Sequence, residues 1–264
     1  VEERKHPLVR ECLKLSGIKG GVEITSTADI PGKGTGLGSS SSYTVGLLNA
    51  LYEFKKTSAD RYKIASEACD IEINKCGEPI GKQDQFAAAF GGFNFIEFLR
   101  DGRSIVNPLR LNYKHQNMME LNTVLYYVGK PRSDSRVIEG TQKKLLVDDV
   151  VTNATHKIKQ ACIEYKNCLL TGNFGRISEL MQTYWEMKLK TNPNVSSPEI
   201  LDAYNYSLQN GATGAKISGA GGGGHMVLFT EFERRHELIT ALKEKEGRVV
   251  PFKFVKHGVD VWRQ

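Results

Sequence analysis

The sequence predicts an α+β protein with two lobes, and three observations support this fold class. Strand-like and helix-like segments are mixed, without the steady alternation of a doubly wound sheet. Two glycine clusters lie far apart in the chain, at residues 34–38 and 219–224. After Pro131 the sequence pattern changes from mixed to mainly helical over most of the next stretch. We therefore expect an N-terminal mixed lobe over residues 1–118 and a C-terminal α/β lobe over residues 119–264.

The first elements are predicted in the order helix, strand, loop, helix. Residues 5–16 have the pattern of a short helix, and residues 21–27 alternate and are β-branched, as in a strand. The loop reads Pro-Gly-Lys-Gly-Thr-Gly-Leu-Gly-Ser-Ser-Ser-Ser-Tyr at residues 31–43. Apolar residues at helical spacing follow it, so the serines stand at a helix start, where hydroxyls cap free amides.

This glycine–serine loop has the composition of a phosphate-binding loop. Backbone amides and the dipole at a helix N-terminus favour negative charge, and glycines let the backbone approach an anion. The alternative is an N-cap followed by a flexible turn, for which one serine would suffice. Phosphate binding is the preferred interpretation. The candidate residues are Gly34, Gly36, Leu37, Gly38, Ser39, Ser40 and Ser41.

The remaining elements follow from periodicity and turn residues. Before Pro131 we expect helices at 58–74 and 83–90, a hairpin of strands 93–98 and 104–109, and a strand at 121–128. After it we expect helices at 152–171, 174–190, 197–209 and 232–246, and strands at 215–217, 225–230, 249–254 and 258–262.

The second glycine cluster reads Ser-Gly-Ala-Gly-Gly-Gly-Gly at residues 218–224, between two predicted strands. A plain hairpin needs fewer glycines, so the run suggests that another backbone or a ligand lies against the loop. Two such loops, one in each predicted lobe, predict a nucleotide clamped where the lobes meet. The candidate residues here are Gly219, Ala220, Gly221 and Gly222.

Composition and charge narrow the classes of partner. The net charge of +6 and the pI of about 8.9 suit an acidic small substrate such as ATP or a sugar phosphate. No Lys/Arg run with interleaved aromatics favours nucleic acid, and no apolar run approaches the roughly 20 residues that span a bilayer. The five cysteines are scattered without a C-x-x-C pair, which predicts a reduced, cytoplasmic setting without structural zinc or disulfides.

Three motifs resemble those of the GHMP kinases. Residues 31–41 resemble their ATP-phosphate motif, and residues 216–224 resemble their C-terminal glycine motif. The stretch Gly-Glu-Pro-Ile-Gly-Lys-Gln-Asp-Gln at residues 77–85 resembles the sugar-kinase branch, closest to bacterial kinases that phosphorylate the anomeric hydroxyl of heptose 7-phosphate. The loop is not a Walker A loop, because no Gly-Lys-Ser/Thr follows the glycines.

The resemblance covers nearly the whole chain and implies a two-lobed fold with a ferredoxin-like C-terminal lobe, with ATP and Mg²⁺ as cofactors. One departure is visible. The family begins with a strand pair that carries a first motif with a basic residue, and that segment should precede Val1. We expect roughly 30 further residues or more there.

Two acidic residues are the candidates for the chemistry. Glu72 falls within an apolar helical arc with Ala68 and Cys69, where a carboxylate is costly unless a cation or hydrogen-bond donors meet it. The alternative is a Glu that snorkels to solvent or pairs with a Lys. Asp84 lies twelve residues further on. The resemblance implies a Mg²⁺ ligand at Glu72, a second one at Ser40, and a catalytic Asp at Asp84, which would otherwise be a helix cap or a surface acid.

Five further residues are weaker candidates for substrate binding: Lys82, Gln83, Arg132, Ser133 and Lys216. Lys82 and Lys216 could equally be solvated, and Arg132 and Ser133 could begin a surface helix. His225 is expected to be a packed strand residue, since no second His or Cys stands at ligand spacing.

The preferred function is therefore an ATP- and Mg²⁺-dependent kinase of a sugar or sugar phosphate, with heptose 7-phosphate as the expected acceptor. A galactokinase- or fucokinase-like activity is the alternative within enzymes. A non-catalytic sensor that binds nucleotide or sugar is the alternative outside them. No membrane or nucleic-acid partner is expected, and the oligomeric state is open, with a homodimer among the alternatives.

Overall fold

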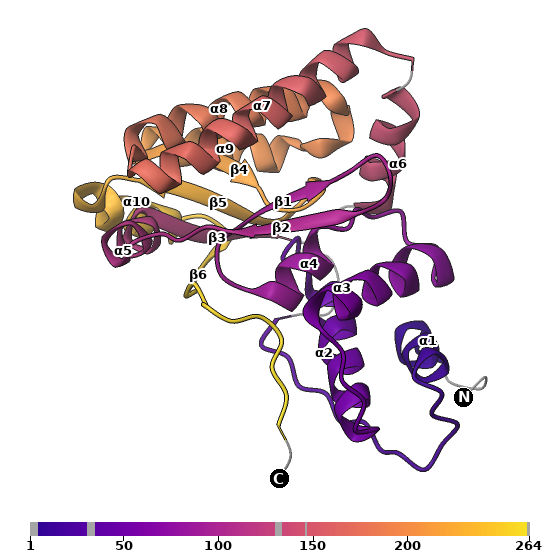
Figure 1. The fold of residues 1–264 in the computed structure, drawn as a ribbon. Coiled ribbons are helices and arrows are strands. Elements are labelled where there is room, and N and C mark those ends of the chain that lie inside the picture. The colour runs from indigo at the N-terminus through magenta and orange to yellow at the C-terminus, as the bar shows by residue number, and fades with distance from the viewer. Residues whose placement is uncertain (1–4, 31–34, 130–133, 146, 263–264) are drawn as a thin grey trace. The chain divides into compact units, whose positions relative to one another are not determined.

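The computed structural model describes residues 5–30, 35–129, 134–145 and 147–262, and the predicted α+β class is confirmed (Figure 1). The chain divides into two compact units. Unit 1 comprises Val1–Lys33, Gly38–Leu109 and Val255–Gln264, and unit 2 comprises Gly34–Leu37 and Arg110–Phe254. Each unit therefore contains segments that are distant in sequence. The domain limits expected from the sequence alone stay a prediction.

Unit 1 is a group of helices with one β-hairpin. Its elements are α1 (Pro7–Leu15), α2 (Ser39–Phe54), α3 (Arg61–Cys69), the π-helix η1 (Asp70–Lys75), α4 (Gln83–Phe90), β1 (Asn94–Phe98) and β2 (Ser104–Pro108). Helix α2 buries Val45, Leu48 and Leu51, which recur at a spacing of three and share one face. This face packs into a core to which α1, α3 and α4 also contribute.

Unit 2 is built on a four-stranded antiparallel sheet with the order β4-β5-β3-β6. The strands are β3 (Thr123–Gly129), β4 (Ala212–Ile217), β5 (Gly224–Thr230) and β6 (Arg248–Val250). The main helices are α7 (Asp149–Thr171), α8 (Phe174–Thr191), α9 (Pro198–Gln209) and α10 (Arg235–Leu242). The chain order β-α-β-β-α-β with this strand order is the predicted ferredoxin-like arrangement.

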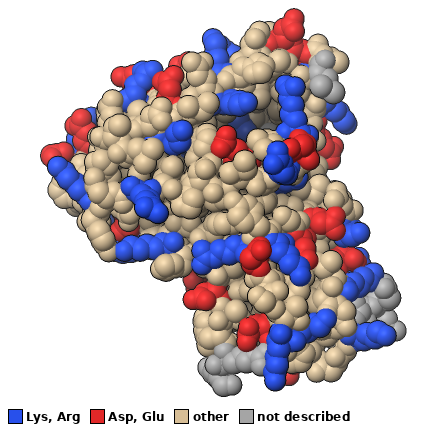
Figure 2. Space-filling view, in the orientation of Figure 1, with Lys and Arg blue, Asp and Glu red and all other residues tan. Residues whose placement is uncertain are grey.

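Helices α7, α8 and α9 lie on the same side of this sheet in Figure 1. Helices α8 and α9 pack against β4, and α7 packs along α8. The core between the layers includes Trp185 from α8, Ile200 from α9, and Met226 and Leu228 from β5. The smaller elements of unit 2 are α5 (Tyr113–Asn122), α6 (Asp134–Lys144), η2 (Pro193–Val195) and η3 (Phe232–Arg234). Charged side chains are spread over the visible face of the molecule in Figure 2, with no large region of one sign.

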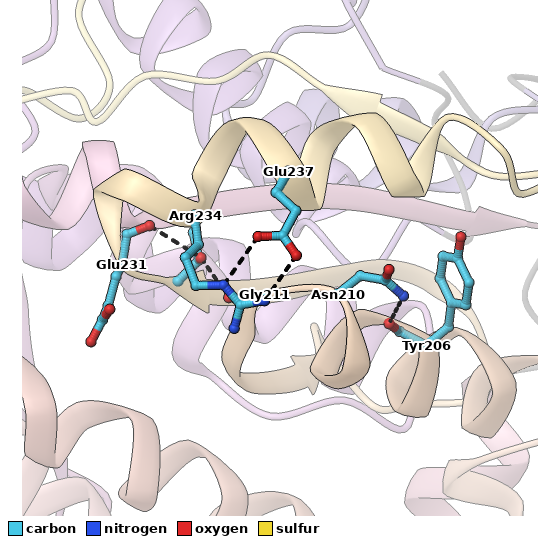
Figure 3. A network of polar contacts seen from close by, with 7 residues as sticks. Tyr206, Asn210, Gly211, Glu231, Arg234 and Glu237 are labelled. Atoms are coloured by element: carbon cyan, nitrogen blue, oxygen red, sulfur yellow. Dashed lines mark hydrogen bonds and ion pairs between the residues drawn. The ribbon is translucent and has the colours of Figure 1, made fainter.

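A polar network fixes the end of the β4–β5 hairpin that is opposite its glycine loop (Figure 3). The Thr230 hydroxyl donates to the carbonyl of Gly211 at 2.7 Å, which ties the end of β5 to the start of β4. The Arg234 amide donates to the carbonyl of Glu231 at 3.0 Å, and its guanidinium pairs with Glu237 at 2.9 Å. The network thus anchors the strand ends and the start of α10.

Several sequence expectations are corrected by the structure. Residues 21–27 are not a strand: Val22 and Ile24 pack half-buried on the core as their alternation predicts, but no described residue forms a ladder with them. Residues 258–262 also lack strand pairing, and the Val259 amide instead donates to the carbonyl of Ala88. The helix expected at 58–74 ends as a π-helix, and the sequence pattern does not predict helices α5 and α6.

Gly91 offers a stability test of unit 1. Its φ is +62°, and a Cβ there would collide with backbone atoms of His257 and Gly258. We expect Gly91→Ala to lower the free energy of unfolding by about 2 kcal/mol or more, measured by urea unfolding. Gly46→Ala is the matched control, because Gly46 lies inside α2 with nothing within 4 Å of a Cβ. It should gain up to about 1 kcal/mol from helix propensity. Equal stability of Gly91→Ala and the wild type would show that the backbone at Gly91 tolerates a side chain.

Candidate functional site

The N-terminus of α2 begins at the glycine–serine loop. Gly38 is the N-cap residue, in the left-handed region with φ 67° and ψ 28°, and no side chain caps the helix. The expectation that serine hydroxyls act as the caps is therefore wrong. Ser39, Ser40 and Ser41 form the first turn, which contains no acidic side chain. The amides of a first turn lack intrahelical acceptors, so this terminus favours an anion.

Glu72 is a fully buried carboxylate, with 0% of its surface exposed. The Ser40 hydroxyl of α2 donates to one of its oxygens, and the Gln85 amide of α4 donates to the other. No described Lys or Arg forms an ion pair with it, so the alternative of a snorkelling or Lys-paired Glu is wrong. Glu72 therefore lies inside unit 1 and is held by hydroxyl and amide donors.

The turn that carries Glu72 is a π-helix, Asp70–Lys75, which continues directly from α3. Here the Cys76 amide donates to the carbonyl of Ile71, five residues earlier, at 2.9 Å. Inserted π-turns are rare and recur at functional sites. The sequence predicts the buried position of Glu72 but not the wider turn that presents it.

Gln85 contacts Glu72 but is not among the site residues predicted from the sequence. It is fully buried, and its side-chain oxygen has no hydrogen-bond partner among the described residues. Gln85, Phe86 and Ala89 form the buried face of α4. Like Glu72, Gln85 is a polar residue on an apolar helical face, and this pattern in the sequence could have identified it as a candidate.

Asp84 lies against the start of α2. A Cβ built on Gly38 would lie 3.1 Å from the Asp84 Cβ and 3.3 Å from its Oδ2. Burial raises the pKa of Asp84, and a hydrogen bond with Gln83 partly offsets that rise. Gln83 and Lys82 themselves are exposed. Unit 1 therefore gathers Gly38, Asp84 and the Ser40–Glu72 pair around the N-terminus of α2.

The earlier half of the same loop belongs to unit 2, where it packs backbone against backbone. A Cβ on Gly36 would lie 2.7 Å from the Ser218 carbonyl oxygen, and one on Gly219 would lie 3.0 Å from the Gly36 Cα. Both residues have positive φ. The two glycine clusters predicted from the sequence are thus in direct contact at these residues. The Leu37 amide donates to the Thr35 hydroxyl at 3.3 Å.

His225 anchors this contact from β5. Its backbone amide and its ring Nδ1 both bond to the carbonyl oxygen of Thr35, at 3.2 Å and 2.7 Å. Because a carbonyl oxygen only accepts, Nδ1 carries a proton. The residue is 2% exposed and its ring lies 5.1 Å from that of Tyr127. The expectation of a packed strand residue is confirmed, with a role in holding the loop.

The rest of the second glycine cluster also packs on backbone. Gly221, Gly222, Gly223 and Gly224 all have positive φ. A Cβ on Gly221 would lie 2.8 Å from the Val195 carbonyl oxygen, and the Gly222 amide donates to that same oxygen at 2.8 Å. The glycine run predicted either another backbone or a ligand against this loop, and the structure shows a backbone, that of Val195. Ala220 is half-buried and contributes to the core.

The remaining candidates lie elsewhere or outside the described part of the chain. Lys216 is half-buried on β4, with its Nζ 4.5 Å from the ring centroid of Tyr184. Gly34, Arg132 and Ser133 lie outside the described residues. Among the residues that the structure describes, no cluster of three or more His, Cys, Asp or Glu side chains could hold a metal ion.

Comparison with known proteins identifies the family. Residues 6–92 match the N-terminal domain of the GHMP kinases, and residues 165–248 match the GHMP kinase C-terminal domain. The chain is 39% identical over 236 residues to a D-glycero-alpha-D-manno-heptose 7-phosphate kinase of Campylobacter jejuni, covering 89% of this chain and 69% of the relative. This chain belongs to the GHMP kinase family.

Two further kinases are also similar to this chain. A crystal structure of a D-glycero-D-manno-heptose 1-phosphate kinase from Bacteroides thetaiotaomicron matches with a TM-score of 0.75 and 30% identity, over 97% of this chain and 75% of that one. A galactokinase of Pyrococcus furiosus is 24% identical over 262 residues, which cover 89% of this chain and 70% of the relative. In the described part of this GHMP kinase, no helix combines the length and apolarity that crossing a bilayer requires.

The raised pKa of Asp84 predicts a stability effect with a defined sign. The folded state holds the Asp84 proton more tightly than the unfolded state, so stability falls as pH rises from the ordinary Asp value, about 3.9, through the folded-state value. We therefore expect Asp84→Asn to raise the free energy of unfolding near neutral pH and to lose this advantage below about pH 4. Urea unfolding of the variant and the wild type, at neutral pH and below about pH 4, measures this difference in stability.

Asp101→Asn is the control for this experiment. Asp101 is exposed, and its hydrogen bond with Arg103 lowers its pKa, the opposite direction. The control should show no gain in stability at neutral pH. An Asp84→Asn protein less stable than the wild type at neutral pH would show that burial does not penalise the Asp84 charge.

Proposed function

We propose that this GHMP-family sugar kinase transfers the γ-phosphate of ATP to the anomeric hydroxyl of heptose 7-phosphate. The choice of heptose 7-phosphate as the acceptor is supported by the 39% identity, over 89% of the chain, to a heptose 7-phosphate kinase. The structural relative at 30% identity is also named as a kinase of a phosphorylated heptose. More distant relatives act on galactose or mevalonate by name, at 24% and 26% identity.

In this proposal the N-terminus of α2 binds the phosphates of ATP. Gly38 has the left-handed backbone that turns the chain into α2, and the first turn bears only serines. Its amides and dipole favour the nucleotide phosphates. Gly36 and the run from Gly219 to Gly222 belong to unit 2. We propose them as further nucleotide-binding residues because they lie in the two glycine motifs that resemble those of the family.

Asp84 is the residue that we propose to engage the attacking hydroxyl. The hydroxyl oxygen forms a bond to the γ-phosphorus, the bond from that phosphorus to the β–γ bridging oxygen breaks, and the hydroxyl proton moves to the Asp84 carboxylate. Burial raises the pKa of Asp84, which makes its carboxylate a better proton acceptor than an exposed Asp. Phosphoryl transfer depends on positioning and electrostatics, and its place against Gly38 supports this role.

The residues around Glu72 fit a Mg²⁺ ion. Mg²⁺ prefers oxygen ligands, one or two carboxylates and nucleotide phosphates, and Glu72 is a buried carboxylate hydrogen-bonded to the Ser40 hydroxyl. The Gln85 amide donates to Glu72, and its side-chain oxygen, without a partner among the described residues, is a further oxygen beside this carboxylate. We propose Ser40 and Glu72 as the protein ligands. When bound, the ion would neutralise charge on the transferring phosphate.

A cytoplasmic location belongs to the same proposal. ATP is the co-substrate, and the five cysteines are all free thiols in the structure, which suits a reducing compartment.

Loss of Asp84 should abolish turnover. We expect Asp84→Ala to lower kcat by about 10²- to 10⁴-fold, since it removes the proton acceptor while leaving the loop in place. ADP release with heptose 7-phosphate, galactose, fucose and mevalonate as acceptors measures both rate and specificity. Glu78→Gln is the control, because Glu78 is an exposed acid of the same segment. Turnover of galactose or fucose alone would reject the heptose assignment, and no turnover of any sugar would reject the kinase proposal.

Loss of Ser40 should weaken the use of Mg²⁺. We expect Ser40→Ala to raise the Mg²⁺ concentration for half-maximal activity about tenfold or more, in line with the loss of a ligand or its support. Ser42→Ala is the matched control, because Ser42 lies in the same turn with an exposed side chain. A Mg²⁺ titration at saturating ATP compares the two. Identical titration curves for both variants would remove Ser40 from the proposed metal site.

A further inference from the structure

Two lysines of unit 2 come together around one tyrosine. Tyr184 and Lys188 are four residues apart on α8, so their side chains lie one above the other on the same helical face. Lys216 approaches from β4, with its Nζ 4.5 Å from the Tyr184 ring centroid. Both lysines are half-buried. Lys216 therefore contacts the Tyr184 ring, and Lys188 lies one helical turn along α8 from that tyrosine.

This lysine pair has no acidic partner among the described residues. Neither lysine forms an ion pair with a described carboxylate. Burial lowers the pKa of Lys188, and burial together with the Lys188 charge lowers the pKa of Lys216. The other titratable group that acts on Lys216 is the thiol of Cys162, on α7. Positive charge is thus concentrated in a partly dehydrated place without a counter-charge.

A purely structural role explains this arrangement poorly. Contact with the Tyr184 ring stabilises one ammonium group, but a second ammonium nearby repels it. Burying charge without a partner is costly, and an uncharged chain such as Met would fill the same space without that cost. An anion that contacts both lysines would remove the repulsion and supply the missing charge.

We propose that Lys188 and Lys216, together with the neighbouring Tyr184, form a binding site for a phosphate group carried by one of the reactants. Lysine binds phosphate as a point charge, and a dianionic phosphate group matches two ammonium groups. The Tyr184 hydroxyl can donate to the same group. The phosphate belongs either to the phosphorylated sugar or to the nucleotide. That choice of ligand rests on the proposed kinase function, whereas the site itself rests on the lysine pair.

Binding of inorganic phosphate tests the site without any reaction. Calorimetric titration should show that Lys188→Gln and Lys216→Gln each weaken phosphate binding about tenfold or more, as expected for loss of a charged contact. Lys190→Gln is the matched control, since Lys190 is exposed on the same helix. It should bind phosphate with the same affinity as the wild type. Phosphate bound at the N-terminus of α2 should be the same in all of these variants. Lys188→Arg and Lys216→Arg, which keep the charge, should restore most of the binding and show that the Gln variants fail through lost charge.

Steady-state kinetics then identifies the source of the phosphate. A rise of about tenfold or more in KM for heptose 7-phosphate in both Gln variants, with KM for ATP unchanged, assigns the site to the sugar phosphate. A rise in KM for ATP alone assigns it to the nucleotide. Unchanged phosphate affinity and unchanged KM values in both Gln variants overturn the proposal. If the wild type shows no kinase activity, the phosphate titration still decides the site, so the two proposals fail separately.

Discussion

The organisation of unit 1 depends on one buried carboxylate. Glu72 lies on an apolar face, and its two oxygens accept hydrogen bonds from Ser40 on α2 and Gln85 on α4. A buried carboxylate oxygen left without a hydrogen-bond donor would cost about 1–3 kcal/mol, and more if the group is charged. Satisfying Glu72 therefore requires α2, η1 and α4 to meet in one register. The same register places Asp84, the neighbour of Gln85, against Gly38.

Glycine serves two physical purposes in this chain, and local sequence does not separate them. The composition of the clusters at 34–38 and 219–224 predicts loops that approach an anion. The structure shows that Gly36, Gly219 and Gly221 are needed where one backbone meets another. Close packing of two loops and close approach to a phosphate both demand the absence of a Cβ. The backbone contact holds the loop that leads into α2, so the two purposes are compatible.

Sequence reasoning succeeded where periodicity and burial decide the outcome. Helices such as α2 and α7, the β1–β2 hairpin and the buried position of Glu72 followed from spacing alone. The prediction of a strand at 21–27 is wrong, because a strand forms only where a neighbouring strand pairs with it, and the local sequence pattern does not reveal that neighbour. The π-turn at Asp70–Lys75 depends on tertiary contacts rather than on propensity.

The segment that follows β6 has a consequence for how the protein is made. The Gly92 amide donates to the carbonyl of Val255, and the Val259 amide donates to that of Ala88. A stretch more than 160 positions later in the sequence thus closes the packing around α4. During synthesis the ribosome must extend the polypeptide by more than 160 residues beyond α4 before α4 acquires these neighbours. Until then the nascent first unit exposes backbone groups that chaperones or water must satisfy.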